Sequence, residues 1–372
     1  MHILFVNSWY PSIVFPTNGD FIQRHAEAVS LHHKVTAIHV VSDPGSDVPL
    51  MISDVMINDV RTLIAYIGNT NNPLLKIIRF TLAYRKLILL AGDFNFVHVN
   101  HIYPAGIVAL MLKWFKNKSY IISEHWTGFH NNGRRPWTIW KHILMKRVSR
   151  SAKFMCPVTQ ELANAMQEIG LKGRYHPVPN VVKTDVFLPV AKKPERFTIV
   201  HVSNMKDYHK NISGLLHVIK KFQDEIGDFM LYMIGDDPGR YAGLIRELGI
   251  KDSNISLIDE IPQEELCQTM AASDIFVLFS RNENLPCVIL ESFSSGVPVI
   301  STNVGGIKEY FPSDFGILID EGDEVALLDA LLSVYHHKFS FADPREMHDY
   351  AQTHFSADKI GTKFSKLYLS IN

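Results

Sequence analysis

Residues 283–310 read ENLPCVILESFSSGVPVISTNVGGIKEY, and this stretch carries the pattern that decides the fold. The apolar run DIFVLFS at 274–280 precedes it and predicts a buried strand. Pro286 stands where a helix would begin, because its missing N–H costs nothing in a first helical turn. The helix continues through CVILESFSSG to Gly296, a residue suited to a C-terminal cap, and PVIST predicts the next strand. This order predicts part of a parallel α/β sheet.

The same alternation of strand and helix runs through the chain in two series. The first holds the apolar runs HILFVN, KVTAIHVV, FVHVN, SYIISEH and KFMCPVT, and the second holds RFTIVHVS, MLYMIGD, NISLID, DIFVLFS and PVIST. Continuous apolar strands between amphipathic helices indicate parallel sheets that are covered on both faces. The segment 176–197 has four prolines and no clear periodicity, which is typical of a linker. We therefore predict two doubly wound α/β domains.

We place these domains at 1–188 and 189–354, and we expect a C-terminal helix at about 355–372 to pack back onto the first domain. In doubly wound sheets, ligands bind beyond the carboxyl ends of the strands. Two such domains that face each other would therefore form a cleft for a ligand.

Composition excludes several classes of protein. The chain has 372 residues and a net charge of −1, so it lacks the basic excess that nucleic-acid binding requires. Its three cysteines lie far apart and form neither a disulfide framework nor a zinc site. The N-terminus lacks a signal-peptide pattern, and no apolar run reaches the roughly 18 residues of a membrane span. We therefore expect a reduced, cytoplasmic protein.

The 18 histidines raise the possibility of a bound metal, which we do not predict. The closest grouping is His98 and His101, in HVNH. No carboxylate or cysteine lies at ligand spacing from them, so the set of potential ligands is wrong for a metal site.

The stretch at 283–310 also contains a pair of carboxylates. Glu283 precedes the predicted helix, and Glu291 lies on its second turn. The helix N-terminus, with free amides and a positive dipole, would point to the same edge of the sheet. A phosphate could bind there, with one carboxylate accepting hydrogen bonds from sugar hydroxyls and the other from ribose hydroxyls. The alternative is a loop acid and an exposed helix acid that bind nothing.

The spacing of these residues resembles the E-x7-E motif of retaining glycosyltransferases of family 4, which have the GT-B fold. The likeness extends from SRNENLP at 280–286 to SSGVPVISTNVGGIKEY. It implies that Glu283 contacts the donor sugar and Glu291 the donor ribose, and that Asn284, Leu285 and Pro286 adjoin the donor. It further implies transfer of a hexose-type sugar from a nucleotide-diphosphate sugar to a glycan or lipid-linked acceptor, as in bacterial surface polysaccharide synthesis.

Other segments are similar to parts of the same family. VSNMKDYHKNISGLLHVI resembles the loop in which an Arg and a Lys grip the donor diphosphate, and Lys210 matches the Lys. The Arg is absent from its usual place, and Lys206 is the nearest cation. Gly235, in MIGDDPGR, matches part of a Gly-x-Gly element near the nucleotide, although the second Gly is replaced. Ile261 is the candidate in the segment that cradles the base. We expect no cofactor and no metal, because Lys210 and a helix N-terminus would supply the positive charge that a metal held by a D-x-D pair supplies elsewhere. Neither DPGSD at 43–47 nor DDPGR has that arrangement on a strand end.

Two features of the N-terminal half match the family less closely. Asn18, Gly19 and Asp20 form a loop ahead of a helix, where a glycine lets the backbone approach a ligand. They resemble the loop that meets the donor phosphate and the acceptor, but a plain surface turn is the alternative. His125, in IISEHWTGF, corresponds by resemblance to a histidine that faces the reaction centre, although a structural histidine is the alternative.

The segment 113–153 is strongly basic, with ten Lys or Arg residues against the single acid Glu124. It also holds Trp114, Trp126, Trp137 and Trp140, four of the five tryptophans. PWTIWKHILMKRV predicts an amphipathic helix with cations on one face, which is typical of contact with an anionic membrane surface. The alternative is a domain helix whose apolar face is core. A membrane contact would make the protein peripheral on the inner face of the membrane.

Two rival functions remain on this architecture. One is a nucleotide-sugar epimerase, and the other is a nucleotide-sugar-binding subunit whose catalysis has decayed, as the absent Arg and altered Gly-x-Gly would allow. Donor turnover with release of the nucleoside diphosphate separates the binding subunit from a transferase. The identity of the sugar, base and acceptor is left open.

Overall fold

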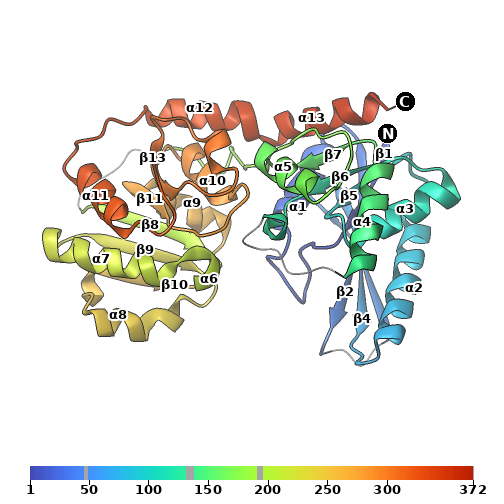
Figure 1. Ribbon diagram of the computed structural model, residues 1–372, viewed down its shortest axis with the longest axis horizontal. Coiled ribbons are helices and arrows are strands. Elements are labelled where there is room, and N and C mark those ends of the chain that lie inside the picture. The colour runs from blue at the N-terminus through green and yellow to red at the C-terminus, as the bar shows by residue number, and fades with distance from the viewer. Residues whose placement is uncertain (46–48, 131–137, 191–195, 372) are drawn as a thin grey trace. The chain divides into compact units, whose positions relative to one another are not determined.

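The computed structural model describes residues 1–45, 49–130, 138–190 and 196–371 of the chain (Figure 1). The chain divides into two compact units. Unit 1 comprises Met1–Val181 together with Ala357–Asn372, and unit 2 comprises Val182–Ser356. The chain therefore passes from unit 1 to unit 2 between residues 181 and 182, earlier than the boundary predicted after residue 188. Within the described ranges, no helix is long and apolar enough to cross a membrane.

Unit 1 is built on a seven-stranded sheet of order β3-β4-β2-β1-β5-β6-β7. The strands are β1 (His2–Asn7), β2 (Lys34–Asp43), β3 (Leu50–Ile57), β4 (Val60–Gly68), β5 (Phe96–Asn100), β6 (Tyr120–Glu124) and β7 (Met155–Pro157). Every neighbouring pair is parallel except β3 and β4. These two form a hairpin through Asn58 and Asp59, whose φ angles of 45° and 63° suit a tight two-residue turn.

Helices cover both faces of this sheet. They are α1 (Asp20–Ser30), α2 (Pro73–Ala91), α3 (Ala105–Lys116), α4 (Ile139–Ser151), α5 (Gln160–Glu168) and α13 (Ala357–Leu369), with a short helix η1 at Thr127–Phe129. The connections from β4 to β5, β5 to β6 and β6 to β7 all cross the sheet in one direction, so right-handed crossovers place α2, α3 and α4 on one face. The connection from β1 to β2 runs the other way, which places α1 on the opposite face, where α13 packs against it.

The C-terminal helix α13 completes the core of unit 1. Ile360, Phe364 and Tyr368 are fully buried in the same apolar cluster as α1 and the central strands. The helix approaches α1 closely, since a Cβ on Gly361 would lie 2.1 Å from the Ala28 carbonyl oxygen. The last residues of the chain therefore belong to the fold of its first half.

Several histidines lie inside the core of unit 1 in neutral form. His25 Nε2 lies 3.0 Å from the Pro179 carbonyl oxygen, and His39 Nδ1 lies 3.0 Å from that of Asn7. Burial lowers the pKa of each of these two rings to about 4. Burial also holds the pKa of His98 well below its ordinary value, and that ring bonds Tyr368 Oη and Ser123 Oγ at 2.6 and 2.7 Å.

Unit 2 has a six-stranded sheet of order β10-β9-β8-β11-β12-β13, parallel throughout. Its strands are β8 (Thr198–Ser203), β9 (Met230–Gly235), β10 (Ile255–Ile258), β11 (Ile275–Leu278), β12 (Val299–Thr302) and β13 (Gly316–Ile319). Its helices are α6 (Asp207–Lys210), α7 (Ile212–Ile226), α8 (Ala242–Leu248), α9 (Gln263–Ala271), α10 (Cys287–Ser294), α11 (Glu324–Tyr335) and α12 (Pro344–Phe355). Two sheets of this kind confirm the predicted doubly wound α/β class.

The strand order of unit 2 fixes where a ligand can bind. From β8 the chain builds outward through β9 to β10, and then returns to add β11 on the other side of β8. The connections that follow β8 and β11 therefore leave the sheet in opposite directions. Such a point opens a crevice beyond the carboxyl ends of the two strands, and this is where open α/β sheets bind ligands.

We expect Phe364→Ala to destabilise unit 1 by about 3–5 kcal/mol, because it removes a fully buried ring and leaves a cavity. All five tryptophans lie in unit 1, so urea unfolding of the full chain followed by tryptophan fluorescence reports on this unit. Lys366→Ala, at an exposed position of the same helix, is the matched control and should change stability by less than about 0.5 kcal/mol. An equally small effect of Phe364→Ala would show that α13 does not support the core.

We also expect the free energy of unfolding of unit 1 to fall as the pH drops below 6.5. His39 titrates near 6.5 when unfolded but only near 4 when folded, so in this window the unfolded state binds the proton and the native state does not. Each such histidine should remove about 1.4 kcal/mol for each pH unit between these two values. In the same fluorescence assay, His39→Gln should flatten the pH dependence by this amount. An unchanged slope would contradict the assignment of a neutral buried ring.

Candidate functional site

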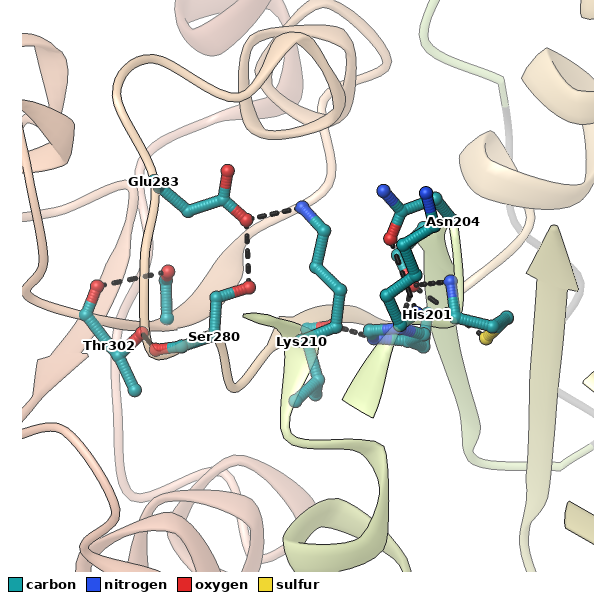
Figure 2. A network of polar contacts seen from close by, with 11 residues as sticks. His201, Asn204, Lys210, Ser280, Glu283 and Thr302 are labelled. Carbon is teal, nitrogen blue, oxygen red and sulfur yellow. Dashed lines mark hydrogen bonds and ion pairs between the residues drawn. The ribbon is translucent and has the colours of Figure 1, made fainter. Parts of the chain in front are cut away.

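Two loops meet at the carboxyl ends of β8 and β11. The first leads into α6, which carries Lys210, and the second leads into α10 and carries Glu283. Lys210 Nζ donates to Glu283 Oε1 at 2.5 Å, and Ser280 Oγ donates to the same oxygen at 2.8 Å (Figure 2). The two charged side chains are only 14% and 9% exposed, so the ion pair lies within the protein. Two of the predicted site residues, 73 positions apart, are thus brought into contact.

The ion pair leaves part of each partner available. Figure 2 shows the second oxygen of Glu283 pointing away from both Lys210 and Ser280. A lysine ammonium carries three N–H donors, of which this pair uses one. A ligand with an anionic oxygen and a hydroxyl could therefore bind both groups without separating them.

The loop that carries Lys210 is fixed by its neighbours. Asp207 accepts hydrogen bonds from Ser213 N and Oγ at 2.7 and 2.9 Å, which ties α6 to the start of α7. Arg281 donates from Nη1 to the Asp207 carbonyl at 2.8 Å and from its backbone N to the His209 carbonyl at 2.7 Å. Arg281 therefore fastens the Glu283 loop to α6. This residue was not among those predicted from the sequence, because it lies 74 positions from Asp207 along the chain.

A buried histidine lies beneath the ion pair. His201, on β8, places Nδ1 2.9 Å from the Val277 carbonyl oxygen and Nε2 2.8 Å from Ser203 Oγ. Burial, with a smaller contribution from Lys210, lowers the pKa of this ring to about 4, so it is neutral near pH 7. Because a carbonyl can only accept, Nδ1 carries the proton and Ser203 donates to Nε2. The ring therefore bridges the two strands whose ends carry the site.

Glu291 lies on α10, the helix into which the Glu283 loop leads. Glu291 is 3% exposed and Glu283 8%, so the alternative of an exposed helix acid does not hold. Asn284 and Leu285, just before the helix, are also buried. Pro286 occupies the N-cap position with an extended backbone, one residue before the first helical turn in which it was predicted.

The Gly-Gly of the opening stretch supports the Glu283 loop. A Cβ on Gly305 would lie 2.0 Å from the Glu283 carbonyl oxygen, and its φ of +57° also favours glycine. The next residue, Gly306, donates its N–H to the Asn284 carbonyl at 3.0 Å. Only a residue without a side chain allows this close approach, so Gly305 is required for the geometry of the carboxylate loop.

Three other residues predicted for the donor side differ from one another in burial and in their place along the sheet. Gly235 ends β9, and a Cβ there would lie 1.7 Å from the Ser203 carbonyl oxygen, so it packs directly against the end of β8. Lys206 is exposed and is the N-cap of α6, four positions before Lys210. Ile261 is half-buried beyond the edge strand β10, which lies two strands away from β8.

Three of the site residues predicted in unit 1 lie at the start of α1. Gly19 is the N-cap of α1 with φ +82°, and a Cβ there would lie 2.9 Å from the backbone of Trp9. Asn18 is exposed, and Asp20 accepts from Arg24 Nη2 at 3.0 Å.

The predicted histidine of unit 1 packs into the interior. The ring of His125 packs against Phe21 and His25, with centroids 4.6 and 5.2 Å away, and both ring nitrogens are buried. Burial, together with His25, holds the pKa of His125 well below its ordinary value.

A buried carboxylate in unit 1 was not predicted from the sequence. Glu124, at the end of β6, is fully buried and accepts hydrogen bonds from His101 Nδ1 at 2.8 Å, Ile102 N at 2.9 Å and Trp126 N at 3.0 Å. Burial alone would raise the pKa of this carboxyl. The effects of His101 and the hydrogen bonds together exceed that of burial, so the pKa is lowered. Trp9 stacks on His101 with ring centroids 4.3 Å apart. The signal was weak, because Glu124 and His101 are separated by a helix in the sequence.

The chemistry open to the donor side follows from this geometry. A partly buried lysine that contacts the loop leading into a helix N-terminus can bind an anionic oxygen such as that of a phosphate. The two buried carboxylates can accept hydrogen bonds from hydroxyl groups. Across the part of the chain that the structure describes, no three His, Cys, Asp or Glu residues are grouped to hold a metal ion.

Comparisons with known proteins show the family and the fold of the chain. Residues 183–354 match the sequence model of glycosyl transferases group 1, and residues 24–186 match that of glycosyltransferase family 4. The crystal structure of HepE from Anabaena with UDP-glucose superposes with a TM-score of 0.73 at 16% identity, over the whole of both chains. This likeness shows the fold, which is GT-B.

Curated relatives match over a shorter span. The chain is 27% identical over 177 residues to N-acetyl-alpha-D-glucosaminyl L-malate synthase of Bacillus anthracis, a match that covers 46% of this chain and 45% of that protein. It is 28% identical over 148 residues to a sulfoquinovosyl transferase of Arabidopsis thaliana, a match that covers 39% of this chain and 28% of that protein. The chain thus spans less than half the length of these relatives. Since the two family models together reach from residue 24 to residue 354, the chain belongs to the glycosyltransferases of family 4.

Proposed function

We propose that the protein transfers a hexose-type sugar from a nucleotide-diphosphate sugar to a hydroxyl of a glycan or lipid-linked acceptor, with retention of configuration. The observation that carries the proposal is the buried Lys210–Glu283 pair at the point where the strand order of unit 2 reverses. Retention is inferred from the family. The similarity to HepE, whose structure contains UDP-glucose, supports a nucleotide-sugar as the donor.

In this proposal the donor diphosphate binds between Lys210 and the first amides of α10. Sugar transfer needs stabilisation of the charge that develops on the leaving diphosphate more than it needs a strong base. Preorganised donors in a site without water are each worth about 2.7–4 kcal/mol in the transition state. Lys210 is preorganised, because Glu283 and the Arg281–Asp207 contact hold α6 in place.

The two carboxylates fix the rest of the donor. Glu283 would accept from hydroxyls of the transferred sugar through the oxygen that faces away from Lys210. Glu291, on the second turn of α10, would accept hydrogen bonds from the two ribose hydroxyls. Because both carboxylates are almost fully buried, each hydrogen bond to them is charge-assisted and little weakened by water.

One departure from the family pattern affects the diphosphate site. The family's Arg is absent from the loop after β8, and Lys206 provides a point charge where an Arg would provide a two-pronged contact. This keeps a binding subunit without catalysis as the second candidate. Incubation with labelled donor and separation of the products decides between them, since a transferase releases the nucleoside diphosphate and a binding subunit returns intact donor.

The acceptor side of the proposal concerns residues 113–153. A lipid-linked acceptor would bring this basic segment to an anionic membrane. Of its tryptophans, Trp114 and Trp140 are 60% and 80% exposed, whereas Trp126 is half-buried against Gly128. Trp137 and the cations Arg134 and Arg135, which belong to the same predicted surface, lie outside the described residues.

We expect Glu291→Ala to weaken binding of the nucleoside diphosphate by about 1.5–3 kcal/mol, because it deletes a charged hydrogen-bond acceptor for the ribose. Calorimetry with UDP, GDP and ADP measures the loss and identifies the base at the same time. Glu247→Ala, at an exposed position on α8, is the control and should bind like the wild type. Circular dichroism shows whether the fold is intact, and Glu291→Gln tests charge without loss of volume. Wild-type affinity in both Glu291 variants would refute the ribose assignment.

We expect transfer to proceed at an unchanged rate in EDTA. Lys210 and the N-terminus of α10 would supply the positive charge that a metal bound to paired aspartates supplies in other transferases. The measurement is the rate of nucleoside diphosphate release from the donor identified by calorimetry, with and without EDTA and with added manganese. Complete loss of activity in EDTA and recovery with manganese would show that the charge comes from a metal.

A further inference from the structure

The helices α2, α3 and α4 expose an unusual amount of apolar surface. Of the 25 large apolar side chains that are exposed among the described residues, 13 belong to these three helices. Ile77, Leu89 and Phe115 are 64%, 67% and 79% exposed, and Trp140 is 80% exposed. The three helices cover the same side of the sheet and stand together beside it in Figure 1. We call their outward side the three-helix face.

The three-helix face is also positively charged. The sequences of α2, α3 and α4 contain ten Lys or Arg residues and no Asp or Glu. Six of the ten are exposed: Lys76, Arg85, Lys86, Lys116, Arg147 and Arg150. On the opposite side of the sheet, α1 and α13 carry both signs of charge. The excess of positive charge therefore distinguishes the three-helix face from the other side of unit 1.

The start of α2 is the strongest single feature. Leu74, Leu75, Ile77 and Ile78 are all exposed on one broad side of the helix, with Lys76 and Arg79 on the rest, and the buried positions begin only at Ala83. The broad apolar side of an amphipathic helix normally faces other protein atoms. Contiguous exposed apolar surface of this kind marks an interaction site. The described part of unit 1 leaves this segment uncovered.

The helices α3 and α4 continue this face as one rigid piece. A Cβ on Gly106 would lie 2.6 Å from Val148 Cγ1, so the two helices are in close contact there. Lys113 Nζ donates to the Ser151 carbonyl at 2.7 Å, which joins their C-terminal ends. The exposed tryptophans Trp114 and Trp140 thus stand on helices that are fixed to each other and to the sheet.

We propose that the three-helix face binds the surface of an anionic lipid bilayer. Exposed Trp, Phe, Leu and Ile side chains would enter the headgroup region, and the six exposed cations would lie near the lipid phosphates. The charge identifies the partner: an apolar face that docked onto a second copy would bring six exposed cations against six others. The proposal adds α2 to the basic segment 113–153 and does not depend on the sugar-transfer chemistry.

The test is sedimentation of the full chain with phosphatidylcholine vesicles, with and without phosphatidylglycerol. The wild type should sediment only with the anionic vesicles at about 0.1 M salt and be released at about 1 M, because the screening length falls from about 10 Å to about 3 Å. The test variant combines Ile77→Ser, Lys76→Gln and Lys86→Gln. Its partitioning should fall at least about 25-fold, since each cation near an anionic surface contributes about fivefold.

The matched control combines Leu31→Ser, Lys359→Gln and Lys366→Gln, which removes one exposed apolar group and two exposed cations from the opposite side of unit 1. It should bind vesicles like the wild type. Equal losses in both variants, or a wild type that ignores anionic vesicles in low salt, would overturn the proposal. The proposal would also be overturned if sedimentation velocity without lipid showed a dimer of the wild type that the test variant does not form. Donor affinity, measured separately, should be the same in all three proteins.

Discussion

The ion pair between Lys210 and Glu283 is the contact on which the proposed donor site depends. It joins the connection after β8 to the connection after β11, and these are the two strands at which the order of the sheet reverses. An enclosed lysine without a partner would carry a large desolvation penalty, and so would an enclosed carboxylate. The two therefore hold each other at the end of the sheet. Arg281, Ser280 and Gly305 serve this geometry by fixing the loops on either side.

Much of this site could be predicted because its residues follow from local rules. Pro286 marks the start of α10, and the spacing of Glu283 and Glu291 places both acids near that start. The two-sheet class was evident from apolar runs of strand length. These features depend on short stretches of sequence, in which composition and backbone geometry act directly.

The features that were missed depend on contacts between distant segments. The bond between Glu124 and His101 joins the ends of two neighbouring strands across an intervening helix, and no spacing in the sequence encodes it. Arg281 contacts α6 only because β11 pairs with β8. The antiparallel hairpin of β3 and β4 was not singled out either, since its turn is the dipeptide Asn58–Asp59 without the usual glycine.

The distribution of charge is another feature that the total for the whole sequence does not reveal. A net charge of −1 describes the whole chain and gives no sign of nucleic-acid binding, yet it conceals three helices whose sequences hold ten cations and no acid. The first turn of α4 connects the three-helix face to the carboxyl edge of the unit 1 sheet. Trp140 projects into solvent, while the adjacent Lys141 lies over the ring of Tyr103 at 4.5 Å and near Trp126 at 5.8 Å. If the proposed acceptor is lipid-linked and its lipid lies in the bilayer beside Trp140, its head group would lie next to these rings.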